Sequence, residues 1–135
     1  MPGALKVAVV TAVLASAKFT KPGPLTVDER AVVESHPVLG ERILAPIEQL
    51  GEVRLIVRCA HEHYDGTGYP DQLTGEQIPL ESRIVLACDA YHAMTTDRPY
   101  RRSLGEEEAR RRLVEASGAQ FDPQVVDALL RVLDA

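Results

Sequence analysis

Apolar residues recur at helical spacing along most of this chain, and no segment shows the strict alternation that is typical of a half-buried β-strand. Residues 4–18 are almost uniformly apolar, which predicts a helix that is covered on most of its sides. Further helices are expected between Thr26 and Ser35, between Val38 and Pro46, over 50–62 and 80–95, between Ser103 and Gly118, and after Asp122. The 135 residues are predicted to form one all-α domain of about six helices.

Short polar sequences mark several of these expected helix starts. Two segments carry Ser or Thr followed three residues later by Glu, the pattern of a capping box: Thr26–Glu29 and Ser103–Glu106. Asp122 before Pro123 predicts an N-cap residue followed by proline in the first helical turn. In the helix that starts at Thr26, we expect three side chains to point inward: Val27, Ala31 and Val32. Residues 35–37, Ser-His-Pro, are expected to interrupt that helix because proline lacks a backbone N–H donor.

Residues 61–70 read His-Glu-His-Tyr-Asp-Gly-Thr-Gly-Tyr-Pro and lie where the 50–62 helix ends. They open a loop over 64–79 that is rich in Gly, Pro and Asp. Metal ions and phosphates both favour such a place, because ligands at a rigid helix end adjoin a loop whose N–H groups can approach an anion. The alternative is an ordinary turn after a helix, in which Glu62 forms a salt bridge or caps the backbone and His63 is a solvated loop residue.

The net charge limits the kinds of ligand to expect, and the cysteines bear on the cellular compartment. The net charge of −5 gives no global attraction to nucleic acid or to anionic lipid, so an anion site requires a local basic cluster. Such a cluster occurs at Arg98, Arg101 and Arg102. Two unpatterned cysteines, Cys59 and Cys88, suggest reduced, partly buried thiols in a cytoplasmic protein, and both are expected to be small core residues rather than metal ligands. No run reaches the roughly 18 apolar residues that a membrane span needs.

Residues 6–17 also imitate a secretory signal, with a basic start, a short apolar run and an Ala-Ser-Ala site. A single lysine and the shortness of the run favour a buried helix instead.

Seven short segments follow one another from residue 21 onward: Lys21–Thr26, His36-Pro37 with Gly40, His61-Glu62 followed by Asp65–Pro70, Gly75–Leu80, Asp89–Tyr91, Asp97–Arg101 and Ser117–Pro123. In this order and spacing, residues 21–135 resemble the HD-GYP family, all-helical and metal-dependent bacterial phosphodiesterases that hydrolyse cyclic di-GMP. The resemblance implies an HD-domain-like helical bundle that is N-terminally truncated. Residues 1–20 would then form a divergent apolar helix in the same single domain.

The resemblance also implies roles for individual residues. Three residues match metal ligands of the family: His36, His61 and Asp89. Three others match positions that contact the cyclic dinucleotide: Tyr69, Arg98 and Arg101. Three ligands could hold one iron, manganese or zinc ion if water fills the other positions, or no metal is bound and the residues persist as hydrogen-bonded polar groups. His92 shares a helix face with Asp89 and could orient its carboxylate or add a ligand, although an orienting or surface role is favoured.

Several family positions are occupied by other residue types. The His-Asp pair of the family falls at Val7 and Ala8, and its phosphate-binding lysine falls near Thr11. Where the family has the first of two adjacent histidines, this chain has Ala60. Where the family has a second aspartate on the metal-bearing helix, this chain has His92. These departures favour a degenerate domain in bacterial signalling that binds a cyclic dinucleotide or a protein. The alternatives are a phosphodiesterase with a reduced metal site and a non-functional gene fragment.

Association is the last expectation. The helices over 50–62 and 80–95 carry apolar positions that N-terminal helices cover in the family. We therefore expect a homodimer, or a contact with a signalling partner, through residues 4–18 and the flanks of these two helices.

Overall fold

The structure, a computed structural model, describes residues 23–97 and 101–135. Five α-helices account for most of these residues: α2 (Val27–Leu44), α3 (Gly51–Arg58), α4 (Leu80–Thr95), α5 (Glu106–Glu115) and α6 (Pro123–Leu133). Two 3₁₀ turns lie in the connections: η1 (Glu48–Leu50) and η2 (Gly75–Gln77). Within the two described ranges there are isolated bridges but no strand, so the predicted all-α class is confirmed. The helix expected over 4–18 lies outside the described residues.

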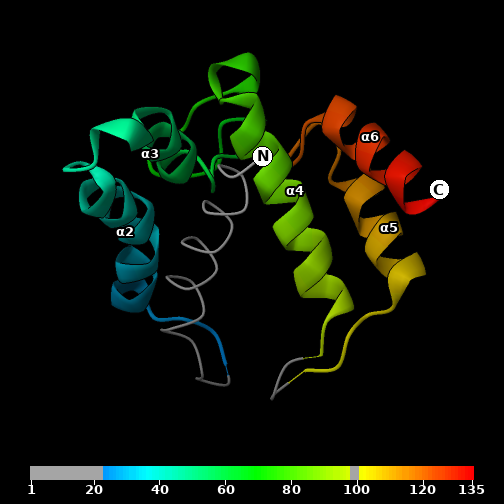
Figure 1. Cartoon of the computed structure of the whole chain (residues 1–135). Helices are drawn as coiled ribbons and strands as arrows, with labels where there is room; N and C mark the ends of the chain where they lie inside the picture. The colour runs from blue at the N-terminus through cyan, green and yellow to red at the C-terminus, as the bar shows by residue number, and fades with distance from the viewer. Residues whose placement is uncertain (1–22, 98–100) are drawn as a thin grey trace.

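Helix α4 joins the two halves of the described chain. Figure 1 shows α2 and α3 on one side of α4, and α5 and α6 on the other side. Helix α2 packs against α3, and α3 in turn contacts α4. Helices α5 and α6 pack against each other and against α4. A residue near the end of α3 is therefore held between α2 and the loop that leads into α4.

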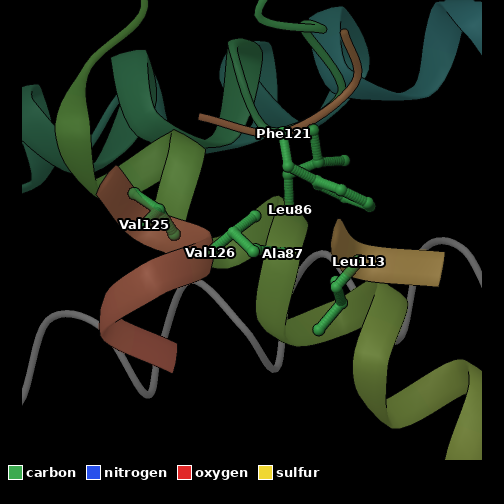
Figure 2. Packing of buried hydrophobic residues seen from close by; sticks show 6 residues of the cluster. All are labelled: Leu86, Ala87, Leu113, Phe121, Val125 and Val126. Atoms are coloured by element: carbon green, nitrogen blue, oxygen red, sulfur yellow. The ribbon is translucent and has the colours of Figure 1, made fainter. Parts of the chain in front are cut away.

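Two hydrophobic clusters stabilise this arrangement. The larger cluster is shown in Figure 2 and joins α4, α5 and α6 through six buried residues: Leu86, Ala87, Leu113, Phe121, Val125 and Val126. The smaller one centres on Leu44 of α2 and Val57 of α3, with Val85 of α4 packed against it. Each fully buried Leu, Val or Phe side chain contributes roughly 1.5–3 kcal/mol to the free energy of folding. The clusters thus hold α4 from both sides.

Helix α2 is one continuous helix of 18 residues, so the expected interruption at residues 35–37 is wrong. Pro37 lies inside it and is buried. The three residues expected to point inward are exposed, Val27 to 84% and Val32 to 46%. The face that packs inward carries His36, Pro37, Gly40 and Leu44 instead. The buried positions of α2 thus lie at and after residue 36, beyond the three residues that were expected to face inward.

The helix starts were predicted with mixed success. Thr26 caps α2 as expected, since its hydroxyl oxygen accepts from Glu29 N–H while the carboxylate of Glu29 accepts from Thr26 N–H. Asp122 caps α6 by accepting from the N–H of Gln124 at 2.8 Å. The second capping box is wrong: Gly105, with φ of +83°, precedes α5 and provides no side-chain cap. The N–H of Ser103 donates instead to the carboxylate of Asp97.

The loop over 64–79 is confirmed as the longest connection among the described segments, with η2 its only helical turn. It is attached to the turn between α5 and α6. The backbone N–H of Tyr64 donates to the carbonyl of Gln120, and that of Asp65 donates to the carbonyl of Ala119. The loop thus touches both halves of the described chain.

Two further features concern the cysteines and the membrane. Cys59 is buried as expected, but Cys88 is exposed, so its predicted place in the core is wrong. The side chain at position 88 extends from the outer face of α4, while Leu86 and Ala87 occupy the inner face. None of the described helices has the length and apolar content that a membrane crossing requires.

Candidate metal and ligand site

Two histidines from different helices meet at the junction of α2 and α3. His36 lies in the middle of α2 and is only 7% exposed. His61 follows α3 by three residues, in the turn that ends this helix. Their Nε2 atoms lie 2.9 Å apart, and the rings meet edge to face with centroids 4.7 Å apart. The structure thus brings together two of the three residues that the sequence assigned to a metal.

The other ring nitrogen of His36 is held by its own helix. Its Nδ1 lies 2.5 Å from the carbonyl oxygen of Val33. A carbonyl oxygen can only accept, so Nδ1 carries the proton and donates. Nε2 then carries the lone pair when the ring is neutral. This is the tautomer that directs an unprotonated nitrogen toward His61.

Burial keeps the imidazole of His61 neutral. Loss of solvation lowers the pKa of His61 to about 4, and the nearby rings of His36 and His63 act in the same direction. A neutral ring at pH 7 has a lone pair available for a metal or a hydrogen-bond donor. His63, as expected for a loop residue, remains partly exposed and contacts the hydroxyl of Thr67 through Nδ1.

Tyr69 covers this histidine pair. Its ring stacks on His61 with centroids 5.2 Å apart and an interplanar angle of 11°, and it lies 6.4 Å from the ring of His36. The N–H of Tyr69 donates to the carbonyl of His61 at 3.2 Å. Burial raises the pKa of the Tyr69 phenol, so the hydroxyl stays protonated near neutral pH. The loop therefore places an aromatic ring beside the two imidazoles.

Glu62 is the residue whose importance the sequence reasoning understated. It is 1% exposed, and its two carboxylate oxygens accept from the backbone N–H groups of Asp71, at 2.6 Å, and Leu73, at 3.0 Å. This confirms the capping alternative, but the caps are on a loop ten residues further along rather than on a helix. Only the position of Glu62 at a helix end before a Gly-rich loop could have signalled this role.

A salt-bridge network holds the same loop through the side chain of Asp71. The guanidinium of Arg58 forms two parallel hydrogen bonds with the carboxylate of Asp71, at 2.6 and 2.8 Å, and a third with Glu41 of α2 at 2.7 Å. This bidentate geometry is the strong form of an Arg–carboxylate pair. The Arg58 side chain accordingly lowers the pKa of Asp71. The network connects α2, α3 and the site loop.

Asp89, the third residue assigned to the metal, lies on α4 and is partly buried. Burial raises its pKa, while the charge of His92 acts in the opposite direction. Across residues 23–97 and 101–135, no group of three or more His, Cys, Asp and Glu side chains is close enough to hold a metal ion. The described structure therefore gathers His36 and His61 without Asp89. The three-ligand set remains a prediction, as does an orienting role for His92.

Of the basic residues assigned to ligand contact, Arg98 lies outside the described residues. Arg101 is exposed, and its Nη2 donates to the carbonyl of Ala93 at 2.6 Å, near the C-terminal end of α4. Arg102 is also exposed. Their contact with a ligand, like that of Tyr69, remains a prediction.

The histidine pair fits a metal ion in its donor chemistry. Two nitrogens that bind one ion at about 2.1 Å each lie about 3 Å apart when the bonds meet at a right angle, as in an octahedral site, and the two Nε2 atoms lie 2.9 Å apart. The Nδ1–H···O=C bond of His36 is the kind of outer contact that orients a ligating imidazole. Imidazole nitrogens suit iron, manganese or zinc, and water or another group would fill the remaining positions.

Comparison with known proteins places these features in a family. A family model described as "HD domain" matches residues 14–125. The cyclic di-GMP phosphodiesterase response regulator RpfG of Xanthomonas campestris is 45% identical over 115 residues, which cover 82% of this chain and 30% of that protein. A cyclic di-GMP phosphodiesterase of Thermotoga maritima is 40% identical over 116 residues, 83% of this chain and 31% of its own length.

A solved structure agrees in fold. The crystal structure of a cyclic GMP-AMP specific phosphodiesterase of Vibrio cholerae superposes with a TM-score of 0.67 at 20% identity, over 95% of this chain and 33% of that one. The chain thus spans about a third of the length of the relatives it matches. With a family match over residues 14–125, the chain belongs to the HD domain family and is related to the HD-GYP cyclic di-GMP phosphodiesterases.

Proposed function

We propose that this chain binds a divalent metal and a cyclic dinucleotide but does not hydrolyse the dinucleotide at the rate of a complete two-metal site. The observation that carries the proposal is the pair of Nε2 atoms of His36 and His61, 2.9 Å apart beneath Tyr69. This pair would supply two ligands to an ion, here iron, manganese or zinc. The ion would attract the phosphates of a ligand and polarise their oxygens.

Recognition of a dinucleotide is supported by Tyr69 at the histidine pair and by Arg101, which lies near the C-terminal end of α4. The stacked ring of Tyr69 supplies an aromatic face of the kind that binds nucleobases. Arg101 supplies an exposed guanidinium, whose planar fork matches phosphate oxygens. The relatives named above are phosphodiesterases for cyclic dinucleotides, which makes this ligand class the first to test.

The low rate of hydrolysis follows from the ligands present. Two-metal catalysis clamps the attacking and leaving oxygens between two ions, and this needs more ligands than two imidazoles. Ala60 stands directly before His61, is 1% exposed and has no donor atom, at a position where the HD-GYP resemblance implies a histidine. The alternative, a phosphodiesterase with a reduced metal site, is favoured by the 45% identity to a named phosphodiesterase.

The experiment is a titration of the purified chain with Mn²⁺ and then with cyclic di-GMP, followed by an assay for hydrolysis. We expect His61→Ala to weaken Mn²⁺ binding at least about tenfold, since even outer partners of a ligand cost that much. His63→Ala is the matched control, because its side chain contacts only Thr67 among the described hydrogen bonds. Equal Mn²⁺ affinity in the two variants would refute the metal site.

Hydrolysis separates the two functions. Binding of cyclic di-GMP without turnover above the metal-free control supports the proposal. Turnover that depends on Mn²⁺ and disappears in Asp89→Ala would support the reduced phosphodiesterase instead.

The cytoplasm is the compartment we propose, because Cys59 and Cys88 are both unpaired thiols.

A further inference from the structure

Pro37 removes one hydrogen-bond donor from the middle of α2. In an α-helix the N–H of each residue donates to the carbonyl four residues earlier, so position 37 faces the carbonyl of Val33. Proline has no N–H, and this bond cannot form. The helix nevertheless runs without a break from Val27 to Leu44. The carbonyl of Val33 thus lacks the donor that any other residue at position 37 would supply.

The imidazole of His36 donates a hydrogen bond to this carbonyl. Its Nδ1 lies 2.5 Å from the oxygen of Val33, one turn earlier on the same helix. His36 and Pro37 are both buried, so water does not compete readily for the oxygen. A backbone N–H at position 37 would be directed along the helix axis at the same acceptor. The carbonyl oxygen of Val33 is therefore both the atom that loses a donor at Pro37 and the atom that accepts from the His36 side chain.

We propose that Pro37 is a positioning residue that sets the tautomer of His36. By leaving the carbonyl of Val33 to Nδ1–H, it keeps the proton on Nδ1 and the lone pair on Nε2. Nε2 is the atom that faces His61 at 2.9 Å. The inference rests on the proposed function only for what Nε2 then binds, because the tautomer exists with or without a metal.

The test is the protonation pattern of His36 in the metal-free chain with ¹⁵N-labelled histidine. Long-range ¹H–¹⁵N correlation spectra distinguish Nδ1–H from Nε2–H, and the signals are assigned by their loss in His36→Gln. In the wild type we expect a single Nδ1–H tautomer. In Pro37→Ala we expect a measurable Nε2–H fraction and averaged nitrogen shifts. Wild-type shifts in Pro37→Ala would overturn the proposal.

Two further variants isolate the cause. Val38→Ala changes the next residue of α2 without touching either partner of the Val33 carbonyl, so it should keep the wild-type pattern. Lactic acid in place of Pro37 has neither the ring nor the N–H, since an ester oxygen replaces the amide nitrogen. We expect it to restore the single tautomer. If it behaves like Pro37→Ala, the ring rather than the missing donor is responsible and the proposal fails.

Metal affinity separates this inference from the proposed function. Loss of a contact that orients a ligating imidazole typically weakens metal binding about 10–100-fold. We expect Mn²⁺ to bind Pro37→Ala at least about tenfold more weakly than Val38→Ala. A wild type that shows the single tautomer but binds no Mn²⁺ would refute the proposed metal site and leave the role of Pro37 standing. Tight Mn²⁺ binding with an unchanged tautomer in Pro37→Ala would do the reverse.

Discussion

The ring of Tyr69 lies nearly parallel to the imidazole of His61, and the backbone N–H of Tyr69 donates to the carbonyl of the same histidine. The loop therefore returns to the helix end from which it left, and it is held there by its backbone as well as by a ring. A stacked pair of this kind adds about 0.5–1.5 kcal/mol beyond the area it buries. The position of His61 depends on how closely the chain can make this return.

The backbone at Gly68 lies so close to the backbone of residues 61–63 that Gly68→Ala should destabilise the fold. A Cβ at position 68 would lie 2.5 Å from the carbonyl oxygen of His61 and 2.6 Å from Cα of Glu62, and both are backbone atoms of the turn. We expect a loss of at least about 2 kcal/mol in the free energy of unfolding, measured by urea denaturation. Gly51→Ala is the control. Nothing lies within 4 Å of its Cβ, and alanine should stabilise α3 by up to about 1 kcal/mol.

Glu62→Gln tests the buried cap of the site loop. An amide NH₂ cannot accept, so one of the N–H groups of Asp71 and Leu73 loses its partner in a buried place. An unsatisfied buried donor costs about 1–3 kcal/mol, and we expect a decrease of this size in the free energy of unfolding. The exposed Glu76 in η2 is the control, since Glu76→Gln should change stability by less than about 0.5 kcal/mol. Equal effects in both variants would show that the hydrogen bonds of Glu62 to the loop do not contribute to stability.

The pair of Arg58 and Asp71 predicts a dependence of stability on pH. The pKa of Asp71 is lowered in the folded chain, so its contribution is present above its ordinary value of 3.8 and is lost as the pH falls through the folded value. Because both side chains are about a third exposed, we expect Asp71→Asn to cost only about 0.5–1 kcal/mol at pH 7. The difference from wild type should shrink in urea denaturation below pH 4. A difference that grows in acid would contradict the assignment.

The cysteines predict selective labelling. Burial raises the pKa of Cys59 to about 11 and also raises that of Cys88, but Cys59 is only 1% exposed whereas Cys88 is exposed. Thiol reagents attack the thiolate, so native protein at pH 8 should react at Cys88 long before Cys59. A thiol-reactive chromophore should therefore label one thiol in the native protein and two thiols after denaturation. Cys88→Ser should leave no fast reaction, while rapid labelling of that variant would mean that Cys59 is accessible.

The expected association has a described surface to act through. Three apolar side chains on the flanks of α3 and α4 are exposed: Leu55 by 52%, Leu80 by 49% and Ile84 by 43%. Burying a few hundred Å² of such surface is worth several kcal/mol at about 25 cal/mol per Å². We expect sedimentation to show a dimer that Leu55→Glu with Ile84→Glu weakens, whereas Val132→Glu, on exposed α6 surface, does not. A wild-type monomer at micromolar concentration would remove the prediction.

Local signals in the sequence predicted what they govern directly. Thr26 and Asp122 cap their helices because capping involves residues two or three positions apart. The pairing of His36 and His61 followed from the family resemblance alone, since nothing in the sequence between them specifies it. The continuity of α2 through Pro37 was missed because packing against α3 compensates for one lost hydrogen bond. The bond from Glu62 to Leu73 was missed because a loop's return path has no periodic pattern.

The attachment of Tyr64 and Asp65 to the carbonyls of Gln120 and Ala119 makes the histidine pair dependent on distant helices. The turn that supplies these carbonyls is held in place by Phe121, which packs into the cluster with α4. Amide exchange at positions 64 and 65 should thus follow the opening of α5 and α6 rather than that of α3. A fragment that keeps both histidines but ends before residue 116 would lose this anchor, so the smallest autonomous unit around the site includes helices that contribute no side chain to it.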